Sequence, residues 1–482
     1  MNSIVQTIRN ALFRPVDAAS VAAFRIGFGL IMLLDSIRHI YFYPLHKLYV
    51  APLLFFRFYG FEWVPILHEK VFAVYAVMAI ASFGILLGKF YRSSVAVVGI
   101  GTAWIFLQDQ AVYLNHIYML ILYWVIMFFI PANRYWALDA KHAPEIASNT
   151  LPGWCRLLLI VQIEVILVWA GIVKLNPDWL QLEPLSTWLA KRHEMPFIGQ
   201  LFVMPVVTAV AVYGVIALHL IGAPLLLFRK TRMYVLGLYG FFHLLNHFVF
   251  NIGVFPWVTF YASLICFEPD WPRRIWAGIR RQSYAQPMLD SFSLPSVNKQ
   301  MVIAALLGVW LTYQIGMPMR NWFYDGWVAW NEQGHRFSWR MKLRSKSGNA
   351  IFILYDPAAN KGYMIEPDRY LVGKQGHKMD CQPDMILQMA HFLRDHYAPN
   401  GKLIENVEIY VSSMCSLNYR KPQNLINPRT NLAKVERTLT GNAWITRLKE
   451  PLRPEAWWAL TGKPESNIDA ETAIEPEPSR AQ

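Results

Sequence analysis

Long apolar segments recur along the chain and limit the folds open to it. Each is close to the roughly twenty residues that a helix needs to cross a bilayer, and they lie at about 19–37, 71–88, 94–112, 117–131, 154–175, 203–228, 233–250, 252–267 and 301–318. Of 482 residues, 55% are hydrophobic and only 16% are charged, which is more apolar surface than one soluble core buries. We therefore predict a polytopic α-helical membrane protein with about nine spans. The segments 233–250 and 252–267 could instead form one broken helix.

Basic residues in the short loops predict the orientation of these spans. Arg14, Lys89, Arg134, Arg229 and Arg273 all fall in the loops of one side, and the loops of the other side carry fewer cations. Because lysine and arginine concentrate on the cytoplasmic side, the residues after about 320 are expected outside, in the periplasm if the membrane is a bacterial inner membrane. The net charge of +13 forms no continuous basic stripe, so a nucleic-acid partner is not expected.

The region 320–462 differs from the transmembrane domain, 1–319, and we expect it to be a mainly β extracytoplasmic domain. Apolar and polar residues alternate from Phe337 to Arg344, which predicts a half-buried strand. Ala350 to Tyr355 and Val407 to Val411 predict further strands, and Pro383 to His396 has helical spacing. The acidic end of the chain, 463–482, has few apolar residues and is predicted to be disordered.

The four cysteines show no spacing typical of metal ligands. Cys155 and Cys266 lie in apolar segments, so only Cys381 and Cys415 are candidates for a disulfide.

Lys174 is the most unusual residue of the apolar segments, because it follows a long hydrocarbon-like run and precedes Asn176-Pro177. A lysine there has two interpretations. It could extend to the interface as an anchor beside Trp179, or it could be a reagent whose ammonium form is destabilised by burial.

Other polar residues within the apolar segments are also candidates for function, since the bilayer penalises each of them. Asn115 and His116 follow a polar turn at the outer end of a segment, while Arg25 and Asp35 are expected to be structural. His243, Asn246 and His247 share a helical stretch, but a single histidine pair is weak evidence, and no metal site is predicted. A glycine-rich phosphate loop and a nucleophile elbow are absent from the sequence, which argues against nucleotide and serine-hydrolase chemistry.

Several of these motifs together resemble one known family, the vitamin K-dependent gamma-carboxylases with their HTTM-type membrane domain. The likeness rests on motifs that occur in one order: Phe24-Arg25-Ile26-Gly27, Asn115-His116 with Tyr118, Ala132-Asn133-Arg134, Ala170-Gly171-Ile172-Val173-Lys174-Leu175, Phe242-His243 with Asn246, Trp271-Pro272-Arg273, Phe337-Ser338-Trp339 and Asn427-Pro428-Arg429. The resemblance extends over residues 10–450 and is typical of short, bacterial-like members.

The resemblance implies a reaction in which reduced vitamin K (the hydroquinone) or a menaquinol-like quinol is a co-substrate, with O2 and CO2. A base deprotonates the quinol, oxygen adds, and the strongly basic product removes a proton from the γ-carbon of a glutamate, which CO2 then captures. Lys174 would be the base, with Asn115 and His116 beside the quinone oxygen and His243 and Asn246 also at the quinol. Trp339 would lie in the glutamate-binding surface, where Arg340 and Arg344 could attract carboxylates.

The resemblance leaves two alternatives open. The protein could epoxidise a quinol without carboxylating a peptide or protein, or it could bind quinone in the lipid bilayer without chemistry. The family interpretation makes a geometric prediction: Lys174 should be shielded from water and close to Asn115 or His116.

Overall fold

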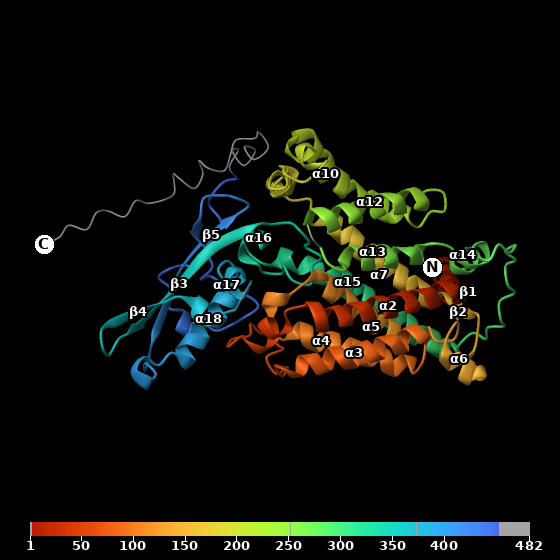
Figure 1. Cartoon of the computed structure of the whole chain (residues 1–482), viewed down its shortest axis with the longest axis horizontal. Helices are drawn as coiled ribbons and strands as arrows, with labels where there is room; N and C mark the ends of the chain where they lie inside the picture. Colours follow the sequence, from red (N-terminus) through yellow and green to blue (C-terminus); the bar gives the residue numbers. More distant parts are fainter. Residues whose placement is uncertain (1, 251, 373, 453–482) are drawn as a thin grey trace.

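The computed structural model describes residues 2–250, 252–372 and 374–452, and it divides into a helical bundle and a smaller domain built on a sheet. The predicted disordered segment 463–482 lies outside the described residues. In Figure 1 the sheet domain adjoins one end of the bundle, while β1, β2, α6 and α14 gather at the opposite end. Lys141 of α6 and Arg273 of α14 therefore share that far end, as the charge pattern of the loops predicts.

Within the described residues, six helices are long and apolar enough to cross a membrane, which confirms the membrane class. They include α2, α3, α7, α12 and α15, and the sixth is the composite of α10, η5 and α11. Three other predicted segments form shorter apolar helices, α4, α5 and the pair α13–η6. The bounds of these elements are α2 Ala19–Phe42, α3 Lys70–Leu87, α4 Tyr91–Leu107, α5 Asn115–Phe129, α7 Gly153–Ile172, α10 Pro205–Ala217, η5 Leu218–Gly222, α11 Ala223–Leu225, α12 Arg232–Phe250, α13 Phe255–Ser263, η6 Leu264–Cys266 and α15 Val297–Met319.

The ends and connections of the bundle carry shorter elements. They are α1 Asn2–Phe13, η1 His46–Val50, η2 Gln110–Val112, α6 Leu138–His142, η3 Pro144–Ile146, α8 Pro177–Leu180, α9 Leu185–Ala190, η4 Gly199–Val203, α14 Trp271–Ile279 and η7 Arg320–Phe323. The strands β1, Pro15–Asp17, and β2, Thr150–Pro152, pair antiparallel and join the start of the chain to the start of α7.

Arg25 and Asp35 of α2 are structural, as expected from the sequence. The buried Arg25 guanidinium donates to the carbonyl oxygens of Ile85 and Leu86 at 2.6 and 2.8 Å, which satisfies the free carbonyls at the end of α3. Asp35 pairs with Arg38 at 2.8 Å and with His39 at 3.3 Å, both within its own helix.

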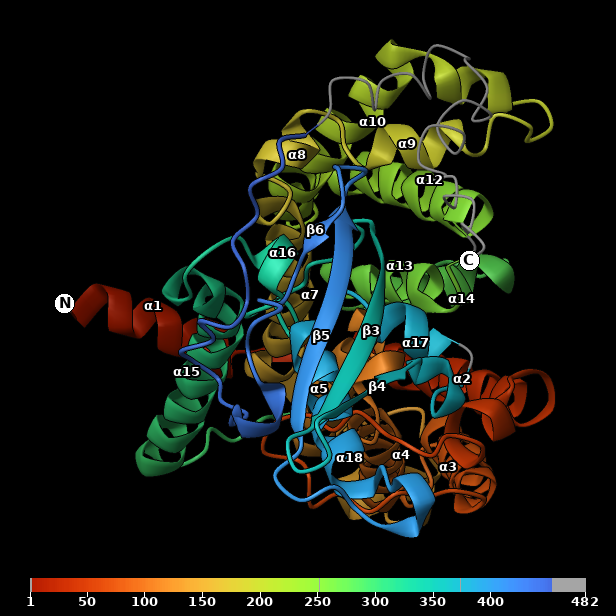
Figure 2. The same cartoon turned by 90° about the vertical axis from the view of Figure 1, so that its left-hand side faces the viewer.

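The outer domain contains a four-stranded antiparallel sheet in the order β4-β3-β5-β6. The long strands β3, Lys346–Asp356, and β5, Glu408–Leu417, lie side by side in Figure 2, flanked by β4, Lys361–Ile365, and β6, Gln423–Asn424. Both strands that the sequence predicts within them are confirmed. The predicted helix is also confirmed as α18, Pro383–His396, which buries Met385 and Met389 against the sheet. The remaining short elements are α16 Val328–Asn331, η8 Pro367–Arg369, α17 Lys374–Met379, η9 Pro399–Gly401 and η10 Leu432–Lys434.

The predicted strand from Phe337 to Arg344 is wrong, because this stretch is irregular and the strand begins only at Lys346. Phe337, Trp339 and Lys342 have positive φ angles of 61°, 55° and 52°, which a pleated strand cannot contain. The alternation of apolar residues has another cause. Phe337 and Trp339 insert into the end of the bundle, where their rings pack on Tyr118 of α5 at 5.0 Å each.

The outer domain is tied together and to the bundle by specific contacts. Cys381 and Cys415 form a disulfide between the residues just before α18 and strand β5, which confirms the pairing. At the interface, Gln375 donates to the buried Asp109 at 2.7 Å, and Gln110 donates to Asp384 at 2.7 Å. Asp109 and Gln110 belong to the polar turn before α5, so that turn positions the sheet domain.

Candidate active site between the bundle and the sheet domain

Lys174 is buried at the end of α7, with only 5% of its surface exposed. The helix ends at Ile172, and the Lys174 ammonium group turns back to donate to the Ala170 carbonyl oxygen at 2.7 Å. Its Nζ also lies 5.5 Å from the centre of the Trp179 ring. Burial beyond the end of the spanning helix lowers the pKa of Lys174 to about 7, because the charged form loses its hydration. The structure contradicts the anchor interpretation, because an anchor needs an ammonium group that extends to water.

The chain after Lys174 is held by a helix stop that the sequence encodes. The side-chain oxygen of Asn176 accepts from the Trp179 backbone N–H at 3.1 Å, and Pro177 occupies the first turn of α8. The Asn176 side chain also donates to the Val173 carbonyl oxygen at 3.0 Å. Asn176 thereby joins the end of α7 to the start of α8 and fixes the turn that carries Lys174.

Asp178 of α8 connects this turn to the sheet domain. Its two carboxylate oxygens accept from Nη1 and Nη2 of Arg420 at 2.6 Å each, and Asn418 donates to the same carboxylate at 2.6 Å. Asp178 and Arg420 are both buried, and the Arg420 guanidinium also lies over the Trp327 ring at 5.2 Å. The outer domain is therefore joined to the Lys174 turn by the bidentate ion pair between Arg420 and Asp178.

A cavity of about 460 Å³ opens beside the Lys174 turn. Its walls come from the end of α7, from the end of α15 with η7 and from the segment before the sheet: Trp169, Ile172, Val173, Leu175, Asn176, Asn321, Trp322, Tyr324, Gly326, Trp327, Val328 and Arg340. The Trp169 and Trp322 rings lie 6.1 Å apart, and Trp322 is exposed at the molecular surface. The volume of this cavity and its aromatic walls are typical of small-molecule sites.

Asn115 and His116 begin α5 on the far side of the Phe337–Arg344 segment. Asn115 accepts from the Tyr113 hydroxyl at 3.0 Å and donates weakly to the Arg340 carbonyl oxygen at 3.5 Å. Arg340 also lines the cavity, so it lies between Asn115 and the Lys174 turn. In the part of the chain that the structure describes, neither Asn115 nor His116 hydrogen-bonds to Lys174.

His116 and His243 both lie near the ring of Phe255. The Phe255 ring centre lies 5.9 Å from that of His116 and 6.4 Å from that of His243. His243 is buried in α12, and its Nε2 has no hydrogen-bond partner within the described residues. Asn246, one turn later, donates to the Phe242 carbonyl oxygen at 2.8 Å.

Trp339 and Arg344 lie on the outer-domain side of the site. Trp339 is only 1% exposed, which makes it a packing residue of the interface between the domains. Arg344 pairs with the buried Glu332, which Lys346 also contacts at 3.1 Å. These two cations hold the pKa of Glu332 well below its usual range. The carboxylate-binding role of Arg344 stays a prediction, and the structure gives this arginine an internal partner.

The structure adds one residue that we did not predict, His219. It lies in the π-helical turn η5, is 4% exposed, and packs against Gly171 of α7. The signal was present in the sequence as an isolated histidine within the apolar segment 203–228.

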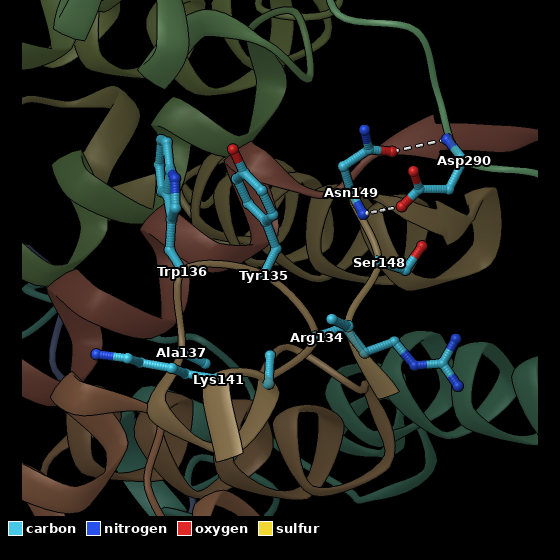
Figure 3. A pocket seen from close by; sticks show the side chains of 10 residues that line it. Arg134, Tyr135, Trp136, Ala137, Lys141, Ser148, Asn149 and Asp290 are labelled. Carbon is cyan, nitrogen blue, oxygen red and sulfur yellow. Dashed lines mark hydrogen bonds between the residues drawn. The ribbon is translucent and has the colours of Figure 1, made fainter. Parts of the chain in front are cut away.

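A second cavity, of about 390 Å³, lies at the opposite end of the bundle and contains none of the predicted site residues. Figure 3 shows Tyr135 and Trp136 side by side on one wall, with ring centres 4.9 Å apart. On another wall Asn149 and Asp290 are joined by two hydrogen bonds of 2.7 and 2.8 Å. Lys174, Asn115 and His116 are not among the residues that line either cavity, but Val173 and Leu175, the neighbours of Lys174, line the cavity of 460 Å³.

Comparison with known protein families matches nearly the whole described chain. Residues 13–271 match the HTTM domain, and residues 299–451 match the lumenal domain of vitamin K-dependent gamma-carboxylase. The first match contains Lys174, Asn115, His116, His243 and Asn246, and the second contains Trp339 and Arg344. No solved structure matches the chain significantly.

Proposed function

This chain belongs to the vitamin K-dependent gamma-carboxylase family, and from that premise we propose that it is an integral-membrane carboxylase and epoxidase. It would couple oxygenation of a reduced vitamin K-type quinol to deprotonation and carboxylation of a peptide glutamate. When bound, the quinol and O2 would supply the strong base that removes the glutamate proton. The protein's part is to activate the quinol, to exclude water and to hold the two substrates together.

The observation that carries this proposal is the burial of Lys174 in a turn whose neighbouring residues, Val173 and Leu175, line an aromatic cavity. A general base must be neutral near the working pH, which an exposed lysine is not. Its low exposure, with a pKa of about 7, gives Lys174 a substantial neutral fraction in a neutral medium. Its polar contact is with the Ala170 carbonyl, and no carboxylate among the described residues forms an ion pair with it.

The cavity between α7 and η7 suits a ring-shaped quinol. Trp169 and Trp322 offer flat apolar faces, and Asn176, between α7 and α8, and Asn321 of η7 add polar side chains to the lining. Trp322 is 61% exposed at the end of the apolar helix α15, so a lipid-soluble quinol can enter from the bilayer. We assign the quinol to this cavity.

The remaining predicted residues do not line this cavity, and their proposed roles rest on the family resemblance. Asn115 and His116 would hold a quinol oxygen or the charge that develops on it, a task for oriented donors in a dry site. Within the described residues the Nε2 of His243 has no hydrogen-bond partner, so His243 would donate to or accept from the quinol. Asn246, one turn later, would support the helix that carries His243.

The peptide substrate would approach from the sheet domain. Arg340 lines the cavity, and its Nε is buried without a partner within the described residues, which suits it to a carboxylate. Trp339 would fix the loop that carries Arg340, and Arg344 would add positive charge to the approach. We place this domain in the periplasm of a bacterial inner membrane, where the disulfide between Cys381 and Cys415 is compatible with an oxidising compartment.

The test is an assay of the purified protein in lipid nanodiscs with reduced vitamin K, O2 and labelled CO2, with and without a glutamyl peptide. The proposal predicts epoxide formation and incorporation of the label into the peptide. Epoxide without labelled peptide would restrict the function to quinol epoxidation. Absence of oxygen consumption with a bound quinol would instead reduce the protein to a quinone-binding protein.

A further inference from the structure

Helix α14 has an apolar face that the rest of the described chain does not cover. Ile275 and Ile279 are four residues apart, so they lie on the same side of the helix, and Trp276 lies next to them. The exposed fractions of Ile275, Trp276 and Ile279 are 54%, 51% and 68%. Three large apolar side chains on one side of a helix of nine residues indicate contact with an apolar phase outside the protein.

The contacts of α14 place this face where the spanning helices end. The backbone N–H of Ser20, at the start of α2, donates at 2.9 Å to the carbonyl oxygen of Pro269, just before α14. Arg273 in the first turn of α14 pairs with Asp17 at 3.0 Å and donates to the Tyr135 hydroxyl at 2.6 Å. Helix α14 is therefore held beside the start of a spanning helix, at the end of the bundle opposite the outer domain (Figure 1).

The four arginines in and directly after α14 differ in their partners. Arg273 has the partners described above, and Arg274 pairs with Asp270 at 2.9 Å. Arg280 and Arg281, at the end of the helix, are both exposed. Within the described residues neither of these two forms an ion pair with a carboxylate. Two positive charges at this end of the bundle are therefore available to an anion from outside the chain.

The available charge adjoins the apolar face. The Arg280 guanidinium lies 4.6 Å from the centre of the Trp276 ring, and Arg281 is the next residue. A ligand for both features must carry negative charge next to hydrocarbon. An anionic phospholipid does, because its phosphate group is joined to its acyl chains, and guanidinium groups bind phosphate well. Free phosphate has no apolar part and would leave Trp276 and Ile279 in water.

We propose that α14, with Arg280 and Arg281, is a binding site for anionic phospholipids. Ile275, Trp276 and Ile279 lie among the acyl chains at the boundary of the bilayer, and the two guanidinium groups bind lipid phosphates. Each arginine contributes about a fivefold preference over a zwitterionic lipid, which is equivalent to about 1 kcal/mol for a basic residue near an anionic surface. This site is independent of the proposed enzymatic function.

The experiment measures which lipids the purified full-length protein retains. Wild type and Arg280→Gln/Arg281→Gln are equilibrated in mixed micelles with equal amounts of phosphatidylglycerol and phosphatidylcholine and then washed, and the retained lipids are quantified by mass spectrometry. We expect wild type to retain an excess of phosphatidylglycerol. The double variant should lower the ratio of the two lipids by about 5- to 25-fold, the effect of one or both arginines.

Two further variants separate charge at α14 from net charge. Arg280→Lys/Arg281→Lys keeps both charges and should keep most of the excess. Lys361→Gln/Arg429→Gln is the matched control, because it removes two exposed cations of the outer domain, one of which lies 5.0 Å from the ring centre of Tyr363. It should keep the wild-type ratio. All variants should share the wild-type temperature of inactivation in phosphatidylcholine nanodiscs, since the substituted side chains are exposed.

Three results would overturn the inference. Wild type could retain both lipids equally, or Arg280→Gln/Arg281→Gln could keep the wild-type ratio. Alternatively, inorganic phosphate could displace phosphatidylglycerol where sodium chloride of the same ionic strength does not, and the two arginines would then bind free phosphate. An equal loss in Lys361→Gln/Arg429→Gln would also contradict it, because net charge and not α14 would then select the lipid.

Discussion

Arg420 donates two hydrogen bonds of 2.6 Å to the carboxylate of Asp178, which lies 242 residues earlier in the sequence. Asp178 lies four residues after Lys174. The outer domain therefore fixes the position of the proposed base. In the proposed function the sheet domain would supply the peptide surface, and its Arg420 anchors the turn that carries Lys174.

Breaking this ion pair should loosen the outer domain. Arg420→Met leaves a buried carboxylate without its partner, at a cost of about 3–5 kcal/mol. We expect a lower temperature of thermal inactivation in detergent and faster proteolysis between the domains. The double variant Asp178→Asn/Arg420→Met should recover part of the loss.

Arg394→Met is the matched control, since Arg394 and Asp395 are exposed and their pair contributes about 0–1 kcal/mol. If Arg420→Met and Arg394→Met changed the temperature of inactivation and the rate of proteolysis equally, the buried ion pair would not stabilise the outer domain.

Turnover should depend on pH in the direction that a lysine base requires. The pKa of Lys174 is lowered to about 7, so its neutral form predominates above that pH and is lost as the pH falls. We expect kcat/KM for the quinol to level off above about pH 8 and to fall about tenfold per pH unit below about pH 6. A profile that is flat from pH 6 to 9, measured with a quinol kept reduced throughout, would be incompatible with this assignment.

The fold and much of the site could be predicted where the signal is local. Helix α18 begins and ends where its amphipathic pattern does, and burial of Lys174 follows from its place at the end of an apolar run. The strand predicted at Phe337 is wrong because the alternation of apolar and polar residues there has another cause. The Phe337 ring packs on Tyr118 of α5, a residue far away in the sequence. The Asp178–Arg420 pair and the packing of His219 on Gly171 are likewise nonlocal, so no period in the sequence indicates them.

The cysteines should report the compartment of the outer domain. When cells are denatured without reductant, a maleimide should label Cys155 and Cys266, which are free thiols, whereas Cys381 and Cys415 should be labelled only after the disulfide is also reduced. Cys381→Ser/Cys415→Ser should lower the stability of the outer domain by about 2–4 kcal/mol. Cys155→Ala, which removes a thiol outside the disulfide, is the control. Free thiols at both positions in cells would contradict the periplasmic location.

The cavity assignment predicts a binding defect rather than a chemical one at Trp322. Trp322→Ala removes an aromatic face near Trp169, a contact worth about 0.5–1.5 kcal/mol. The KM for the quinol should therefore rise about 3- to 10-fold with little change in kcat. Trp63→Ala, at an exposed position whose ring donates to Gly60, should leave both constants unchanged. An unchanged KM in Trp322→Ala would place the quinol elsewhere.

The central claim, that Lys174 is the base that activates the quinol, is tested most directly by the initial rate of epoxide formation in Lys174→Ala. The protein would be purified in nanodiscs and given reduced vitamin K and O2, with its fold checked by thermal inactivation against wild type. We predict that the folded variant loses epoxide formation by about 100-fold or more. Epoxide formed by Lys174→Ala at the wild-type rate would contradict the account.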